Sequence, residues 1–247
     1  MIVPLALLLA QSVAARIARA PDGTVRFTFA VRPGVCGNGR DIRMNRSGGT
    51  YDGDDVECAC EPGPVRVALT VRGGAVESLR TYVGGRWATP APGAIVTDLG
   101  TVAARDAADF LLGLAARDGS RAGEEAIFPA TIADSVTVWP ALLKLARDDH
   151  VARRTRRQAV FWLGQAAGDA ATRGLTDLVD DSRVDREVKE HAVFALSQRP
   201  RDEGVPALIR IARTHGDPEV RKKAIFWLGQ SDDPRALALF EELLTGP

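Results

Sequence analysis

Residues 158–165 read Gln-Ala-Val-Phe-Trp-Leu-Gly-Gln, and two near-copies of this segment follow in the chain. They read His-Ala-Val-Phe-Ala-Leu-Ser-Gln at residues 191–198 and Lys-Ala-Ile-Phe-Trp-Leu-Gly-Gln at residues 223–230. The copies start 33 and then 32 residues apart, which is the length of one helical hairpin. The sequence therefore predicts a repeat array, in which stacked hairpins bury their apolar sides against one another.

The same period extends upstream of these copies. Residues 139–143, Trp-Pro-Ala-Leu-Leu, match residues 205–209, Val-Pro-Ala-Leu-Ile, with Leu175 in the register between them. One further period before Ala159 reaches Ala126, so about four units are predicted, preceded by a helix. This number exceeds the roughly three repeats that an array needs to be stable.

The last copy shows how each unit divides into two helices. Asp217 is a typical N-cap residue, and Pro218 suits the first helical position. The apolar side of this helix contains Val220, Ala224, Ile225 and Leu228. A second helix then begins near Pro234 and contains Leu237, Leu239, Phe240 and Leu243. Neither helix can bury its apolar side alone, so neighbouring units must cover it.

The first helix of the units resembles that of HEAT repeats. The matching patterns are Asp217-x-x-Val220-Arg221-x-x-Ala224 and Asp185-x-x-Val188-Lys189-x-x-Ala192, whereas the earlier copy, Ala152-x-x-Thr155-Arg156-x-x-Ala159, lacks the Asp. The short units are similar to those of the phycobilisome-lyase type. Over residues 121–247 the resemblance implies an α-solenoid that binds other molecules, and its lyase-type subgroup implies chromophore attachment as an alternative.

The N-terminus resembles a secretory signal peptide. Residues 2–10 are uniformly apolar and are followed by small residues, so we expect a signal over residues 1–20 with cleavage after Ala14 or Ala15. No Lys or Arg precedes the apolar run, which leaves an uncleaved anchor or a misassigned start as alternatives. The expected location is periplasmic or extracellular.

A β-rich unit is predicted between this segment and the helices. Val25, Phe27, Phe29 and Val31 alternate with polar or small residues, which is typical of a half-buried strand. A second alternation over residues 65–71 meets Gly73-Gly74 and predicts a hairpin that continues through residues 75–83. The predicted domains are therefore a β unit at 21–87, a linker at 88–102 and the solenoid at 103–247, giving a mainly α protein.

The three cysteines, Cys36, Cys58 and Cys60, all lie in the β unit. In an exported protein they predict one disulfide, with Cys36 bonded to either of the other two and one thiol left over. No Cys-x-x-Cys pair or neighbouring His indicates zinc. The acidic, Gly-rich residues 47–55 could hold calcium, but their spacing differs from the twelve-residue calcium loop and favours a solvated turn.

Charge and motifs favour a protein without catalytic activity or a cofactor. The chain has 32 basic and 32 acidic side chains, so no net charge attracts nucleic acid or membranes. Of the histidines, His150, His191 and His215, His191 aligns with Gln158 and Lys223, as expected for a solvated helix face. The single Glu190-His191 pair is too few for the iron site of deoxyhypusine hydroxylase, which has similar helices.

Residues that share a register are the candidate binding residues. Gln165, Gln198 and Gln230 end the first helix of three units, where their amides would either satisfy helix carbonyls, the interpretation that we favour, or bind a peptide backbone. Trp162 and Trp227 align with Ala195 and could border an open groove, whereas the register of Phe161, Phe194 and Phe226 is expected to be core. The motif cations Arg156, Lys189 and Arg221 complete the set.

Two further expectations concern charge and packing. Arg153, Arg154, Arg156 and Arg157 form a basic cluster that could bind an anionic partner, although a solvated flank is the commoner explanation. Leu208 repeats the register of Leu142 and Leu175 and should pack between units. The resulting hypothesis is a non-catalytic cell-envelope scaffold that binds a polypeptide; the alternatives are a lyase-like or enzyme-accessory protein and a rigid spacer for the β unit.

Overall fold

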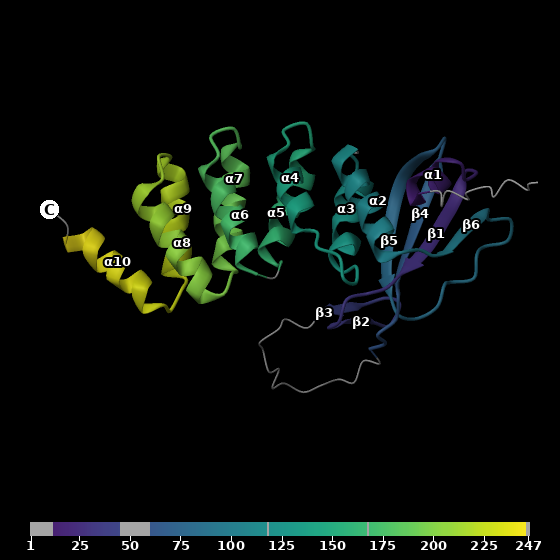
Figure 1. Cartoon of the computed structure of the whole chain (residues 1–247), viewed down its shortest axis with the longest axis horizontal. Coiled ribbons are helices and arrows are strands. Elements are labelled where there is room, and N and C mark those ends of the chain that lie inside the picture. Colours follow the sequence, from purple (N-terminus) through teal and green to yellow (C-terminus); the bar gives the residue numbers. More distant parts are fainter. Residues whose placement is uncertain (1–11, 45–59, 118, 167, 246–247) are drawn as a thin grey trace, which may run out of the picture. The chain divides into compact units, whose positions relative to one another are not determined.

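The computed structural model describes residues 12–44, 60–117, 119–166 and 168–245, which form two compact units. Unit 1 comprises Met1–Leu114 and Ser120–Val136, and unit 2 comprises Ala115–Gly119 and Thr137–Pro247. A mixed β-sheet lies in unit 1, and paired helices form unit 2 (Figure 1). The predicted fold class, mainly α with a β-rich unit before a helical array, is confirmed.

The sheet of unit 1 has the strand order β5-β4-β1-β6. Its strands are β1 (Gly23–Phe29), β4 (Val65–Arg72), β5 (Ala75–Val83) and β6 (Val96–Thr101). β4 pairs antiparallel with β1 and β5, and β6 pairs parallel with β1. The predicted β4–β5 hairpin is confirmed: Gly73 and Gly74 form its turn with φ of 54° and 75°, which glycine adopts at little cost.

One face of this sheet is the core of unit 1. Phe27 and Phe29 of β1 are fully buried there, and Phe27 meets Phe110 of α2 (Ala104–Arg117) edge to face with ring centroids 6.1 Å apart. Helix α3 (Arg121–Thr131) packs against β5. Burying such side chains contributes about 1.5–3 kcal/mol each, which explains why every second residue of β1 and β4 is apolar and buried.

The segment predicted as a linker differs from expectation. Residues 88–102 include β6, whose Leu99 is buried and whose residues pair with Thr24, Val25 and Arg26. The Pro- and Gly-containing stretch before β6 was interpreted as a linker between domains, but it connects β5 and β6 of the same sheet. Helix α3, expected to open the repeat array, belongs to unit 1.

Two short elements complete unit 1. The small sheet of β2 (Val35–Gly37) and β3 (Ile42–Met44) contains Cys36, whose disulfide with Cys60 confirms the predicted single bridge. Helix α1 (Val13–Ala18) buries Val13 and Ile17. Cys58 and the acidic residues 47–55 lie outside the described residues, as do residues 1–11 of the expected signal peptide.

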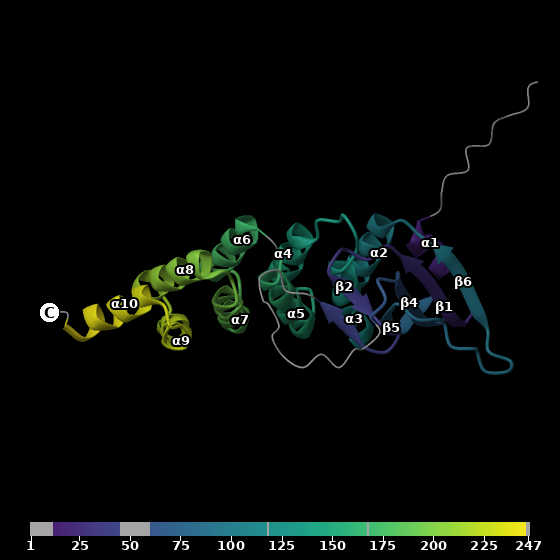
Figure 2. The same cartoon turned by 90° about the horizontal axis from the view of Figure 1, so that it is seen from below.

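Unit 2 consists of two layers of helices. The first layer contains α5 (Arg153–Gly164), α7 (Arg186–Ser197) and α9 (Pro218–Gly229), and the second contains α4 (Trp139–Arg147), α6 (Asp169–Asp180) and α8 (Arg201–Thr214). Neighbouring helices within each layer are in contact, and α10 (Pro234–Thr245) packs on α8 and α9 (Figures 1 and 2). No helix in the described part of the chain is long and apolar enough to cross a membrane.

The repeated residues explain why these helices form and stack. Asp185 and Asp217 accept backbone hydrogen bonds at the N-termini of α7 and α9, whereas Ala152 leaves α5 without a side-chain cap. The predicted inter-unit packing of Leu208 is consistent with its burial, which it shares with the two other leucines of its register, Leu142 and Leu175. These registers form the continuous core that a single hairpin could not provide.

Candidate binding surfaces

An aromatic row crosses the layer formed by α5, α7 and α9. We define it as Phe161, Trp162, Phe194, Phe226 and Trp227. Phe161 and Phe226 retain 38% and 54% of their accessible surface, so the prediction that the Phe register is core is wrong. The buried side of each helix is formed by the Ala register (Ala159, Ala192, Ala224) and by a Leu four residues later. The Phe register lies on a different side of the helix and therefore points outward.

The tryptophans of the row lie beneath the phenylalanines. The Trp227 ring centroid is 4.9 Å from that of Phe194 in the preceding unit and 5.1 Å from that of Phe226. Trp227 is half-buried, and its buried indole N–H has no hydrogen-bond partner among the described residues. Trp162 is likewise half-buried and meets Phe161 edge to face at 5.1 Å. The indoles therefore support the row, while the Phe side chains present it to solvent.

The three glutamines occupy equivalent C-cap positions, as their register predicts. Their backbone N–H groups bond within α5, α7 and α9. Among the described residues, the side-chain amide of Gln198 bonds to Ser197 Oγ at 3.2 Å, and those of Gln165 and Gln230 have no partner. In the part of the chain that the structure describes, none of the three amides therefore bonds a helix carbonyl.

Gln198 and Gln230 instead border a cavity of about 220 Å³ beside the aromatic row. Trp227 forms part of its wall, together with residues at the start of α8. Exposed amides can both donate and accept hydrogen bonds. This cavity therefore combines an aromatic wall with groups that match a peptide backbone.

Arg199 satisfies the carbonyls that the glutamines were expected to bond. Its guanidinium donates to the carbonyl oxygens of Gly164 at 3.2 Å, Gly168 at 2.9 Å and Ala166. It also donates to Thr172 Oγ1 at 2.8 Å and to Glu203 at 3.0 Å. Hydrogen bonds from the Thr172 hydroxyl and from Arg199 lower the pKa of Glu203. This single side chain thus joins the end of α5, the start of α6 and α8.

The motif cations are largely used within the array. Arg156 is buried and pairs with Asp185, the cap of the next unit, at 2.6 Å, and Arg221 donates to the carbonyl oxygen of His215 at 2.6 Å. Burial raises the pKa of Asp185, but hydrogen bonds from Val188 N–H and Arg156 outweigh this effect and lower it. Lys189 is half-buried. Arg156 is therefore a residue of the repeat interface and does not belong to an open binding surface.

Other members of the basic cluster also pair across units. Arg153 lies 3.1 Å from Glu187 of α7, and Arg157 bonds the other oxygen of the same carboxylate. These pairs, together with that of Arg186 and Asp217 at 2.9 Å, connect successive first helices. Carboxylates of the following unit therefore neutralise part of the charge of the basic cluster.

Residues 182–247 match the family model of HEAT repeats. This segment contains α7 to α10, where the Asp-x-x-Val-basic-x-x-Ala pattern is complete. HEAT repeats generally mediate protein binding, and stacked repeats of this kind provide extended surfaces for it. No curated protein matches the chain in sequence.

A second surface of unit 2 is a groove on the layer of second helices. It has a volume of about 580 Å³ and is lined by Trp139 and Leu143 of α4 and by residues of α6, with Glu203 of α8 at one side. A Cβ at Gly174 would lie 3.3 Å from Leu143 Cδ2, so the glycine lets α4 and α6 approach closely. We call it the α4–α6 groove.

Trp139 was not among the candidate binding residues predicted from the sequence. A signal was present, because Trp139 takes the register of Val205 in a later unit. A large aromatic residue in one unit, at a register where another unit has a smaller residue, indicates a surface that is particular to that unit. The carboxylates of Asp169 and Asp177 give this groove an acidic border, which Arg173 offsets through its pair with Asp169.

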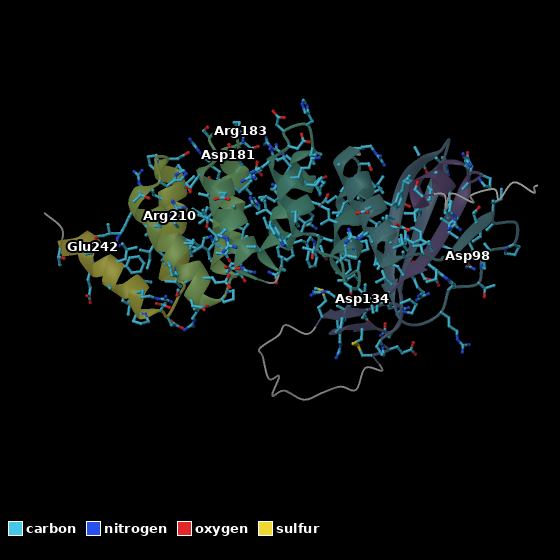
Figure 3. The ribbon with its side chains drawn as sticks, in the orientation of Figure 1. Asp98, Asp134, Asp181, Arg183, Arg210 and Glu242 are labelled. Carbon is cyan, nitrogen blue, oxygen red and sulfur yellow. A yellow bond between two sulfur atoms is a disulfide. The ribbon has the colours of Figure 1, made fainter. Side chains whose placement is uncertain are left out.

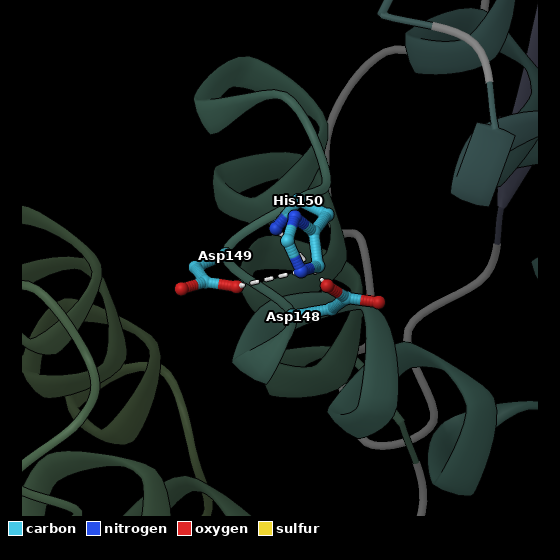
Figure 4. Close-up of side chains that lie close together, drawn as sticks. All are labelled: Asp148, Asp149 and His150. Carbon is cyan, nitrogen blue, oxygen red and sulfur yellow. Dashed lines mark hydrogen bonds and ion pairs between the residues drawn. The ribbon is translucent and has the colours of Figure 1, made fainter.

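Histidines and acidic loops provide no built metal site in the described residues. Asp148, Asp149 and His150 have ligand atoms within 4.8 Å of one another (Figure 4), but His150 and Asp149 are almost fully exposed. His191 Nδ1 bonds the Glu187 carbonyl, and His215 bridges the Val179 carbonyl and the Asp217 N–H. We assign no ion to these residues.

One loop aspartate has a strongly shifted pKa. Two hydrogen bonds from the Arg183 guanidinium to Asp181, labelled in Figure 3, contribute most, and together with the Arg183 backbone N–H they lower the pKa of Asp181 to about 2. The pair closes the loop between α6 and α7. The Asp181–Arg183 pair therefore contributes to the stability of the loop, and we assign it no chemical role.

Proposed function

We propose that this protein is a non-catalytic scaffold that binds a polypeptide through the aromatic row. The observation that carries the proposal is the exposure of Phe161 and Phe226 at one register of a rigid helical layer. Covering one such ring would contribute up to about 1.5–3 kcal/mol. Aromatic anchors on a pre-organised surface are typical of binding hot spots.

The surroundings of the row favour a polypeptide as the partner. Apolar side chains of a partner would cover the two Phe rings, while the amides of Gln198 and Gln230 would bond its backbone. The supporting Trp227 is fixed between Phe194 and Phe226, so little side-chain entropy is lost on binding. No observation in the described part favours the lyase-like or spacer alternatives over binding.

The α4–α6 groove is a second candidate surface for the same function. Trp139 and Leu143 offer an apolar wall, and the carboxylates beside them favour a segment that carries a basic residue. Its volume of about 580 Å³ lies within the range of about 300–1,000 Å³ that is common for ligand sites. The two surfaces lie on opposite layers of unit 2 and can be tested separately.

The test is affinity capture from an envelope fraction with matched variants of the full chain. Phe161→Ser/Phe226→Ser removes the exposed rings, and Leu237→Ser/Leu244→Ser removes two exposed apolar side chains of α10 as a control. We expect one polypeptide to be lost with the Phe variant and retained with the control, and then to bind the purified protein at least about tenfold more weakly after the Phe change. If the Phe variant still captures the polypeptide and Trp139→Ala does not, the α4–α6 groove is the binding surface. Equal capture by all forms would contradict the proposal.

We also propose that the protein is exported. The Cys36–Cys60 bridge supports an oxidising compartment. Cleavage after Ala14 or Ala15, however, would divide α1, whose Val13 is buried and whose Arg16 donates to the Leu99 carbonyl at 2.8 Å. The mature chain is therefore expected to keep Ser12, the side-chain cap of α1, and with it the apolar segment as an uncleaved anchor.

Intact-mass measurement and N-terminal sequencing of the protein from the envelope will locate this end. A mature chain that retains Ser12 and Val13 is the expected result. A chain that begins after Ala15 would show that α1 is dispensable, and an unprocessed cytosolic chain would contradict export.

A further inference from the structure

The outer face of the sheet in unit 1 contains a buried arginine. Along β4, Val65 and Val67 point to the core, so Arg66 points to the opposite face. There Arg66 is only 4% exposed. Its guanidinium carbon lies 5.0 Å from the ring centroid of Trp87 and 5.3 Å from that of Tyr82, and the two rings meet edge to face.

Among the described residues, this buried cation has no anionic partner in hydrogen-bond contact. Its Nε is buried without a hydrogen-bond partner, and its guanidinium forms no hydrogen bond or ion pair with any described residue. The carboxylate of Glu61 attracts it only through space, since that carboxylate accepts the Gly85 N–H at 2.9 Å. Burial lowers the pKa of Arg66, which reflects the cost of holding the charge there.

Arg199 shows what a satisfied buried arginine looks like in the same chain. Its side chain is 5% exposed, comparable to that of Arg66, yet it donates to three carbonyls, a hydroxyl and a carboxylate. An unpaired charge in such surroundings is destabilising. The contacts of Arg66 with two aromatic faces offset part of this cost.

A cavity adjoins the unsatisfied guanidinium. It has a volume of about 310 Å³, and its apolar wall includes Trp87, Ala68 and Val96. Two further cations, Arg26 and the exposed Arg86, line it, whereas none of the described Asp or Glu residues does. Arg26 is neutralised by Asp98 at 2.7 Å, so the cavity keeps an excess positive charge.

We propose that this cavity binds a small organic carboxylate, with its carboxylate on Arg66 and its apolar body against Trp87. A guanidinium matches a planar carboxylate with two parallel hydrogen bonds. The volume, at the lower end of the range for ligand sites, suits a compact molecule. The apolar wall can cover the body of an organic carboxylate, whereas inorganic phosphate has no apolar body to bury there, which favours the carboxylate.

Calorimetry on the full-length protein tests this assignment with three probes: benzoate, its neutral isostere benzamide, and inorganic phosphate. Loss of one charge-assisted interaction, worth about 1.5–3 kcal/mol, predicts that benzamide binds about 10- to 100-fold more weakly than benzoate. The indole N–H resonance of Trp87 should shift with benzoate. Equal binding of benzoate and benzamide, stronger binding of phosphate, or no binding of benzoate would each overturn the proposal.

Variants separate a binding role of Arg66 from a structural one. Arg66→Met should abolish benzoate binding while the thermal midpoint stays unchanged or rises, because it removes an uncompensated buried charge. Arg80→Met on neighbouring β5, where Arg80 is exposed, is the matched control and should keep wild-type affinity. If Arg66→Met does not fold, Arg66→Lys keeps the charge without the fork and should bind benzoate several-fold more weakly. Benzoate binding retained in a folded Arg66→Met protein would refute the site.

Discussion

Replacing Arg199 by Met should be among the most destabilising single changes in unit 2. The side chain is 5% exposed and joins the carbonyls that end α5 to Thr172 of α6 and Glu203 of α8. Met retains much of the apolar length of Arg but none of its five donors. The substitution therefore isolates the hydrogen bonds from the packing.

The expected loss of stability depends on whether water can reach each acceptor once the guanidinium is removed. The Gly164 carbonyl belongs to a buried residue, and leaving it unsatisfied costs about 1–3 kcal/mol. Gly168 is exposed and Glu203 half-buried, so water can replace part of their bonds, at about 0.5–1.5 kcal/mol each. Because these losses share one network and are not additive, we expect a decrease of about 3–5 kcal/mol in the free energy of unfolding, the range for breaking a buried ion pair.

Urea unfolding followed by tryptophan fluorescence will measure this loss. A Trp87→Phe background leaves Trp139, Trp162 and Trp227, all in unit 2, as reporters. Arg183→Met, at a side chain that is largely exposed, is the control and should cost under about 1 kcal/mol. A loss below about 1 kcal/mol for Arg199→Met, or equal losses for the two variants, would refute the role assigned to Arg199.

Three further predictions concern stability. Leu208→Ala, at a fully packed position between units, should lower the free energy of unfolding by about 2–5 kcal/mol in urea titrations, and a cost under about 1 kcal/mol would mean that the repeat register is misassigned. Replacing Cys36 and Cys60 by Ser opens a loop with a sequence separation of 24, which should cost unit 1 about 3–4 kcal/mol as reported by its tryptophan; an unchanged midpoint would contradict this. Because Arg183 lowers the pKa of Asp181 from 3.8 to about 2, the pair should stabilise the fold above about pH 4 and lose this effect as pH falls toward 2. An Asp181 pKa near 3.8 in a carboxyl NMR titration, or an acid transition unchanged in Asp181→Asn, would be inconsistent with that pair.

Several elements could be predicted because their cause is local. The register of Ala159, Ala192 and Ala224 requires helices that stack at a fixed period, and all three residues are fully buried. Asp217 and Pro218 specify a helix start through their own side chains, and the structure places α9 there. The Gly73-Gly74 turn likewise needs only its own residues to allow positive φ.

The errors arose where a distant segment decides the environment. Phe161 and Trp162 are adjacent in the sequence and equally apolar, so the sequence alone did not reveal which of them faces solvent. Residues 88–102 were assigned to a linker because the pairing of β6 depends on β1, far away in the chain. One disulfide from Cys36 was predicted, with Cys58 or Cys60 as its partner, and only the folded positions of the strands and loops select Cys60.

The sequence also did not predict the roles of Arg199 and Arg66. Arg199 has no equivalent in the other copies, which carry Ala166 and Ser231 at that register. Arg66 lies in the polar phase of an alternating strand, a position that is usually solvated, but a later segment places Trp87 over it. Period and alternation in the sequence determined the helical array, the hairpin and the inward faces, because those patterns act within one element or between identical neighbours. Tertiary structure alone decided which polar groups are buried and which of them remain unpaired, because burial of a side chain depends on segments that no local pattern places.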